Sequence, residues 1–180
     1  MRKVIRKWFW AWEFDKEEAW LNDMAAKGKV LVAVRYMTYE FEDCTPGEYA
    51  VRLEMLENAP DTAEGLAYID FVESIGVEYV GRVMKWVYFR KKTADGPFEL
   101  HGDNATRIRR LKGIQRLLLP LAIVNAGMAV YNFCVGIGLA SPMNVVCSLC
   151  SVAVAVLLGV GMTKLNDKKL QLEKEAQLFE

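Results

Sequence analysis

The stretch LLLPLAIVNAGMAVYNFCVGIGLASPMNVVCSLCSVAVAVLLGVGMT, residues 117–163, decides the architecture of this chain. It contains no Asp, Glu, Lys, Arg or His. A membrane-crossing helix needs about 20 predominantly apolar residues, so the stretch is long enough for two. Ser141 and Pro142 interrupt it in the way that an N-cap and a first helical residue would. We therefore predict a transmembrane helical hairpin with spans at about 117–139 and 143–162.

In this arrangement Pro120 would lie in the first turn of the first span, where its missing N–H costs little. The alternative is a buried helical hairpin in a soluble protein. A soluble chain of this size rarely keeps two adjacent helices apolar on all sides, which favours the transmembrane hairpin.

Basic side chains flank the predicted hairpin, and the turn between its spans carries no charge. By the positive-inside tendency, we expect both termini in the cytoplasm. The basic collar before the first span suits anionic membrane lipids, at about 1 kcal/mol per Lys or Arg near the surface. Residues 104–116 are predicted to form a juxtamembrane helix that lies on the membrane or continues into the first span, and residues 164–180 a charged cytoplasmic tail. The collar consists of Arg107, Arg109, Arg110, Lys112 and Arg116.

Small side chains recur every four residues along the second span. Such residues let helix backbones approach closely in a membrane. The stripe could seat the first span or a second copy of the protein, or it could be ordinary small-residue content. On the first span, Asn125 and Asn132 share one face and are candidates for hydrogen bonds across helices. The stripe consists of Cys147, Ser151, Ala155 and Gly159.

Charge and cysteine content exclude several classes of function. Residues 1–105 carry 14 basic and 19 acidic side chains, a net charge of −5. An acidic domain argues against nucleic-acid binding. Three of the four cysteines lie in the predicted spans, so we predict no disulfide framework. Cys147 and Cys150 match C-x-x-C, but a thiolate inside an apolar helix would be costly, and we expect no metal or cofactor.

Residues 1–103 are predicted to form a compact α+β domain. Alternating and β-rich patterns predict strands over 4–12, 29–36, 38–42, 48–55 and 77–91, the last with a bulge at Gly81. One helix is predicted over 16–27, capped by Asp15 and stopped by Gly28, and a second from Asp61 to Gly76; in each, the opening Asp has a Glu three residues later. This β-α-β-β-α-β order predicts a ferredoxin-like sandwich, with one antiparallel sheet and both helices on one face. The divided strand after the first helix leaves room for extra hairpin strands.

The domain contains a series of local blocks, which include Phe14-Asp15, Glu17-Glu18, Trp20-Leu21-Asn22, Lys27-Gly28, Pro46-Gly47-Glu48-Tyr49, Tyr68-Ile69-Asp70-Phe71, Gly76-Val77-Glu78-Tyr79-Val80, Trp86-Val87-Tyr88-Phe89-Arg90-Lys91 and Pro97-Phe98-Glu99-Leu100. Together these blocks resemble the bacterial membrane-protein family labelled domain of unknown function 2812. The resemblance covers roughly residues 8–115, and it implies a bacterial cell membrane and a pair or more of spans at the end of the chain. It also implies a regulatory or stress-response role, because some members are encoded beside repressors of the PadR type. It brings no established catalytic residues.

Candidates for chemistry are few. His101, the single histidine, could sense pH or lie in an interface, or be an exposed loop residue. The acids between residues 13 and 18 could form an acid–base pair, but helix starts favour acids and two of them fit caps. The sequence has no nucleophile elbow, Walker loop, G-x-G-x-x-G or H-E-x-x-H motif, so we expect no catalytic residues and no enzyme. These acids are Glu13, Asp15, Glu17 and Glu18.

Five aromatic side chains on the first and last predicted strands are the candidate binding face. If their rings point away from the helices, the open face of the sheet is an apolar patch for a partner or ligand. If they point toward the helices, they are core. The set consists of Trp8, Trp10, Trp12, Trp86 and Tyr88.

These features favour a non-enzymatic regulatory protein, a sensor or adaptor tethered to the bacterial inner membrane by two spans. It would act through a ligand, a protein partner or self-association. A second hypothesis is an accessory subunit of a membrane transport assembly, based on the small-residue stripe. A third, an enzyme acting at the inner leaflet, rests on location alone.

Overall fold

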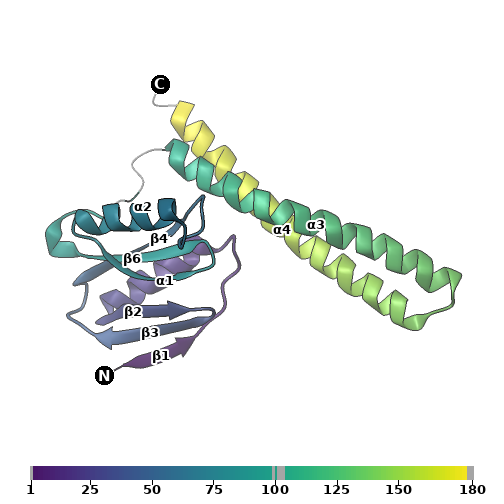
Figure 1. The fold of residues 1–180 in the computed structure, drawn as a ribbon, viewed down its shortest axis with the longest axis horizontal. Coiled ribbons are helices and arrows are strands. Elements are labelled where there is room, and N and C mark those ends of the chain that lie inside the picture. Colours follow the sequence, from purple (N-terminus) through teal and green to yellow (C-terminus); the bar gives the residue numbers. More distant parts are fainter. Residues whose placement is uncertain (1, 99, 101–103, 178–180) are drawn as a thin grey trace. The chain divides into compact units, whose positions relative to one another are not determined.

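The computed structural model describes residues 2–98, 100 and 104–177 of the chain. It divides into two compact units, Met1–Gly102 and Asp103–Glu180. The first unit is a mixed α+β domain, and the second is a pair of long helices (Figure 1).

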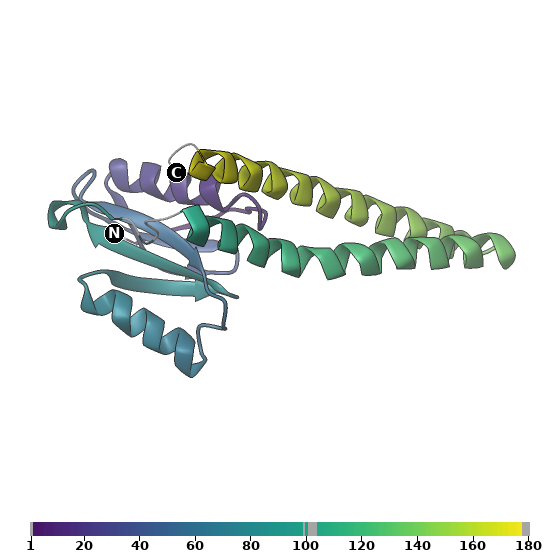
Figure 2. The ribbon, with the colours of Figure 1, turned by 90° about the horizontal axis from the view of Figure 1, so that it is seen from above.

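The first unit holds two sheets of three antiparallel strands, in the orders β1-β3-β2 and β4-β6-β5. Figure 2 shows the strands between helices α1 and α2. Its elements are β1 (Lys3–Arg6), α1 (Phe14–Ala26), β2 (Lys29–Arg35), β3 (Thr38–Asp43), β4 (Tyr49–Met55), α2 (Ala63–Ser74), β5 (Glu78–Val83), β6 (Trp86–Lys92) and the 3-10 helix η1 (Thr93–Asp95).

The same βαββ arrangement occurs twice in this unit. In each half the third strand lies between the first and second. Each half also ends in a hairpin with a two-residue turn, closed by Arg35 and Thr38 in one and by Val83 and Trp86 in the other. The second strand of each half has a register shift at the matching place, before Ala33 and before Gly81. The first unit is therefore an internal structural duplication.

The structure does not confirm the predicted ferredoxin-like sandwich, because two three-stranded sheets replace its single sheet. The strand predicted over 77–91 is instead the hairpin of β5 and β6, although its bulge at Gly81 is confirmed. Met84, in the turn, has a φ of 55°. This left-handed conformation is typical of Gly and Asn, so a methionine in the sequence does not predict it. The strand predicted over 4–12 ends at Arg6.

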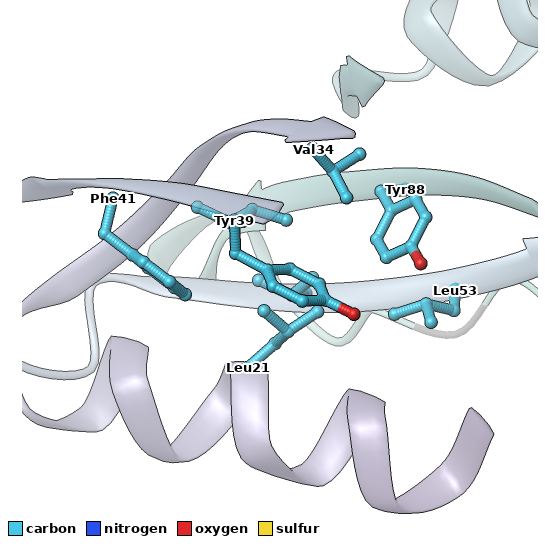
Figure 3. Packing of buried hydrophobic residues seen from close by; sticks show 8 residues of the cluster. Leu21, Val34, Tyr39, Phe41, Leu53 and Tyr88 are labelled. Atoms are coloured by element: carbon cyan, nitrogen blue, oxygen red, sulfur yellow. The ribbon is translucent and has the colours of Figure 1, made fainter. Parts of the chain in front are cut away.

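Alternation along β6 divides the interior into two clusters. Tyr88 faces the cluster under α1, while Val87 and Phe89 face the cluster under α2. Leu21 is the α1 residue in the first cluster, and it points from the helix toward Tyr39 (Figure 3). The first cluster consists of Leu21, Leu31, Val34, Tyr39, Phe41, Val51, Leu53 and Tyr88, and the second of Leu56, Ile69, Val72, Val77, Val87, Phe89 and Phe98.

The two sheets meet where β2 passes β5. Gly81 has a φ of 157°, and a Cβ added there would lie 3.1 Å from Cγ1 of Val34 and 3.5 Å from its carbonyl oxygen. Arg90 on β6 donates a hydrogen bond of 3.0 Å to the carbonyl of Leu31 on β2. The missing side chain at Gly81 lets the two halves approach closely.

Helix α1 covers the free edge of β4, a terminal strand of its sheet. The amide of Asn22 exchanges two hydrogen bonds of 2.9 Å with the backbone of Val51, as a neighbouring strand would. The Leu53 N–H donates to the Glu18 carboxylate at 2.8 Å. These bonds satisfy an edge that would otherwise be a template for another strand.

The second unit consists of α3 (Asn104–Gly138) and α4 (Pro142–Gln177). Both helices are long and apolar enough to cross a membrane. The collar segment continues directly into the first apolar stretch as one helix. This was one of the two predicted alternatives, the other being a separate helix that lies on the membrane. Pro120 therefore lies in the interior of α3 rather than in a first turn. Helix α4 begins at Pro142, as predicted.

Close contacts join α3 and α4 near their turn. Ser148 donates a hydrogen bond of 2.9 Å to the carbonyl of Ala129. A Cβ added at Gly136 would lie 2.8 Å from Cγ2 of Val145. Asn125 and Asn132, the candidates for hydrogen bonds across helices, each donate at 2.8 Å to the carbonyl four residues earlier in α3.

Candidate functional site

The carboxylate of Glu17 is buried beside the first hydrophobic cluster. Glu17, in the first half of α1, is only 8% exposed. Its Oε1 accepts hydrogen bonds from the hydroxyl of Tyr39 at 2.7 Å and from the hydroxyl of Tyr88 at 2.6 Å. Tyr39 comes from β3 in the first half of the duplication and Tyr88 from β6 in the second. Figure 3 shows the two tyrosine hydroxyl groups at the same end of the buried cluster. We refer to these three residues as the Glu17 centre.

The helical period places Glu17 on the inward face of α1, with Phe14 three residues before it and Leu21 four residues after it. A carboxylate early in a helix also interacts favourably with the helix dipole. The matching position of α2, the same distance before Gly76 as Glu17 is before Gly28, is the buried Gly65. A carboxylate at this helix position is therefore a feature of one half only.

Burial controls the electrostatics of this centre. It raises the pKa of the Glu17 carboxyl, and the hydrogen bonds from Tyr88 and Tyr39 offset part of that rise. Burial and the nearby Glu17 carboxylate raise the pKa of both tyrosine hydroxyls. The tyrosines therefore remain protonated donors, and the acid is held by two neutral groups rather than by a Lys or Arg.

Aromatic rings lead from the Glu17 centre toward the surface. The ring of Trp20 lies 5.0 Å from that of Tyr39, and the ring of Phe9 lies 5.7 Å from that of Trp20. The Lys7 ammonium group lies 4.4 Å from the Trp20 ring centre and 4.8 Å from the Phe9 ring centre. These rings therefore already accept a cation on their partly exposed side.

The predicted aromatic face is divided by the structure. Tyr88 is buried in the first cluster and Trp86 is packed against it. Trp12 is 4% exposed, whereas Trp8 and Trp10 are 45% and 38% exposed. Residues 8–12 lie beyond the end of β1. The two-residue period of a strand therefore could not predict which way their rings point.

The acids at the start of α1 do not act as the predicted caps. The helix begins at Phe14, and Glu13 at its N-cap makes no capping hydrogen bond through its side chain. Glu18 bonds the edge of β4 instead. In α2 the cap is Thr62, whose hydroxyl accepts from the Gly65 N–H at 3.2 Å. At α1 the bond of Glu18 to β4 replaces the predicted capping box, whereas α2 keeps a local cap one residue later than predicted.

Sequence reasoning did not single out Glu17, although it grouped it with its acidic neighbours. The feature that could have identified Glu17 was its position between Phe14 and Leu21 on the apolar face of the predicted helix. An ionisable residue on such a face is either paired or functional. Its partners could not be found from spacing, because Tyr39 and Tyr88 lie far away in sequence.

The other predicted residues remain apart from this centre. His101 lies outside the described residues. Among the collar residues, Arg110 is partly buried and the rest are exposed. In the stripe, Cys147 is exposed, and Ser151, Ala155 and Gly159 are partly buried. Within the described residues, no group of three His, Cys, Asp or Glu side chains could hold a metal ion.

Comparison with known proteins identifies the family and nothing beyond it. Residues 13–123 match the family model described as "Protein of unknown function (DUF2812)". This range runs from the start of α1 into α3 and covers more than half of the chain. No curated protein matches, and no solved structure matches. The chain therefore belongs to the DUF2812 family.

Proposed function

We propose that this protein is a membrane-anchored regulatory protein whose first unit senses a positively charged organic ligand at the Glu17 centre. The observation that carries the proposal is a buried carboxylate held by two neutral hydroxyls. Burying an ionised acid without a cation is costly, and such groups are found preferentially at functional sites. A ligand cation would supply the missing charge.

The surrounding side chains support this class of ligand. The Lys7 ammonium group lies over the rings of Phe9 and Trp20, and Trp20 packs against Tyr39. An organic cation could replace the Lys7 ammonium group on these rings and be attracted toward Glu17. Because the centre joins Tyr39 of one half to Tyr88 of the other, a bound ligand would favour one arrangement of the two halves.

The two long apolar helices support a membrane location. We propose the bacterial inner membrane, with both termini in the cytoplasm, because basic residues flank the apolar stretches and the turn carries none. The first unit would then report a cytoplasmic ligand to a protein partner or to a second copy.

The test uses the intact protein in mild detergent and two probes of similar shape and opposite charge. Tetraphenylphosphonium is the cation and tetraphenylborate the anion. Tryptophan fluorescence should change on titration with the cation, and Glu17→Gln should weaken that binding at least tenfold. Asp70→Asn is the matched control, because Asp70 is an exposed acid on α2. Equal binding of the cation by the wild type and Glu17→Gln would refute the proposal, as would tighter binding of the anion.

A second candidate function is an accessory subunit of a membrane transport assembly, which Gly159 favours. A methyl group added there would meet no heavy atom of the described residues within 4 Å. Gly159→Ala should therefore leave the helix pair intact, and Gly159→Leu should reduce the mass of any native complex that uses this face. An unchanged complex mass in mild detergent would count against this function.

A further inference from the structure

We infer that the turn between β2 and β3 docks the first unit on the anionic surface of a bilayer. The docking surface, which we call the aromatic tip, combines exposed apolar side chains with basic ones. This inference rests on the proposed membrane anchoring but not on the proposed ligand. The aromatic tip consists of Trp8, Trp10, Tyr36, Met37, Arg6 and Arg35.

The aromatic tip is one continuous surface. The Lys7 N–H donates a hydrogen bond of 3.1 Å to the carbonyl of Met37, which fixes the segment after β1 beside the turn. The ring of Trp8 lies 5.9 Å from that of Tyr36 and 5.3 Å from that of Trp10, in edge-to-face contacts. These contacts hold the rings in place although the rings are exposed.

Exposure of these side chains is high for their type. Tyr36 is 63% exposed, Trp8 45%, Met37 40% and Trp10 38%. Single exposed apolar residues are ordinary, but a contiguous group on one turn indicates a surface that contacts something apolar.

The register places two guanidinium groups beside these rings. Arg6 on β1 and Arg35 on β2 both pair with Thr38 on β3, so they flank the same end of the sheet, and both are exposed. Glu13 accepts a hydrogen bond of 3.4 Å from the Trp10 N–H, so this acid lies at the aromatic tip, and it also accepts one of 2.6 Å from Lys16, which balances its charge. The aromatic tip is therefore positively charged.

The acids on the same sheet also have a basic partner. Glu42 lies 2.7 Å from Arg2, and Glu40 lies 3.9 Å from Arg2. Both acids are partly buried. A single Arg2 guanidinium serves both acids, but the register places Glu40 opposite Val4 and Glu42 opposite Val30, toward the end of β3 that is away from Thr38. Their distance from Thr38 along β3 limits how far they offset the charge of the aromatic tip.

A bilayer fits this chemistry better than a protein partner does. Trp and Tyr concentrate at the boundary between lipid and water, and Arg and Lys bind anionic headgroups. Helices that cross the membrane would also keep the first unit at a high local concentration of lipid, so weak contacts suffice.

The apolar surface of α2 provides a contrast. Leu66 and Phe71 are 51% and 60% exposed, but Glu64, Asp70 and Glu73 are exposed on the same helix. An anionic leaflet would repel that surface. Phe71 is therefore a matched control residue, aromatic and exposed but outside the aromatic tip.

Tryptophan fluorescence reports on the first unit alone, because all five tryptophans precede residue 87. The intact protein is reconstituted in vesicles of phosphatidylcholine and phosphatidylglycerol whose acyl chains are brominated near the headgroups. We expect the bromines to quench a measurable fraction of the emission. Arg6→Gln with Arg35→Gln, which keeps every tryptophan, should at least halve that fraction. Phe71→Ser should leave it unchanged.

The outcomes separate docking from anchoring. Flotation of the protein with the vesicles reports anchoring by the helices, and quenching reports docking by the aromatic tip. Flotation without quenching overturns the inference and leaves the anchoring intact. Quenching that survives both Arg6→Gln with Arg35→Gln and Tyr36→Ser also overturns it. A third result would also overturn the inference: no quenching, together with a native complex with another protein that Trp8→Ser dissociates. The surface would then bind a protein and not a bilayer.

Discussion

Replacing Glu17 by Gln should remove a pH-dependent loss of stability from the first unit. Because burial raises the pKa of this carboxyl above its ordinary 4.5, the folded state holds the proton more tightly than the unfolded state does. The contribution of Glu17 to stability is therefore fully present below pH 4.5 and falls as pH rises toward the folded pKa. Above that pKa the deficit is constant. Gln cannot ionise, so the variant should lack this fall.

The magnitude follows from linkage and from the geometry of the Glu17 centre. Each unit by which the folded pKa exceeds the unfolded one costs about 1.4 kcal/mol at neutral pH. Solvent screens this cost little, because Glu17 is 8% exposed. The Gln oxygen can still accept from Tyr39 and Tyr88, whereas its NH₂ group lacks a counterpart, a loss of about 1–3 kcal/mol that does not vary with pH. The pH dependence of the difference between the two proteins is therefore the diagnostic quantity.

Urea titration followed by tryptophan fluorescence measures the unfolding free energy of the first unit in the intact protein. The difference, Gln variant minus wild type, should become more favourable to the variant between pH 4 and pH 8. Acids with lowered pKa values make the unfolding free energy rise with pH. They are present in both proteins, so their contributions cancel in the difference. One of them is Asp43, because its hydrogen bond to Lys29 lowers the pKa of its carboxyl to about 2. A difference that stays flat, or that moves toward the wild type as pH rises, would refute the reasoning.

Three further predictions concern packing and edges. Asn22→Ala should lower the unfolding free energy by about 1–3 kcal/mol, because the Val51 backbone on the edge of β4 loses both of its bonds to Asn22; urea titration measures this, and no loss would mean that water replaces the amide. Phe89→Ala should cost about 3–5 kcal/mol, since Phe89 is 0% exposed; the same titration applies, and a cost below about 1 kcal/mol would contradict the packing described. Gly136→Val should separate α3 from α4 near their turn, because the added Cβ would lie 2.8 Å from Cγ2 of Val145. A disulfide between Ala129→Cys and Ser148→Cys should then form more slowly than it does in a protein with the same two cysteines and the wild-type Gly136. An unchanged rate would show that the helices do not approach each other there.

The sequence by itself determined the second unit in outline. An uninterrupted apolar stretch with a Ser-Pro break is a local property, and local backbone bonding in helices is sufficient to interpret it. The start of α4 at Pro142 was therefore predictable. The continuity of α3 through Pro120 was not, because whether a helix ends or continues at a proline depends on its neighbours.

Tertiary structure alone decided the duplicated fold and the Glu17 centre. The turn at Met84 adopts a left-handed conformation without Gly or Asn, so periodicity joined β5 and β6 into one strand. Sheet order then followed from pairings between distant residues, which no local pattern encodes. Glu17 was readable as an acid on an apolar helix face. Its meaning came from Tyr39 and Tyr88, which the two halves bring to one oxygen from far apart in the chain.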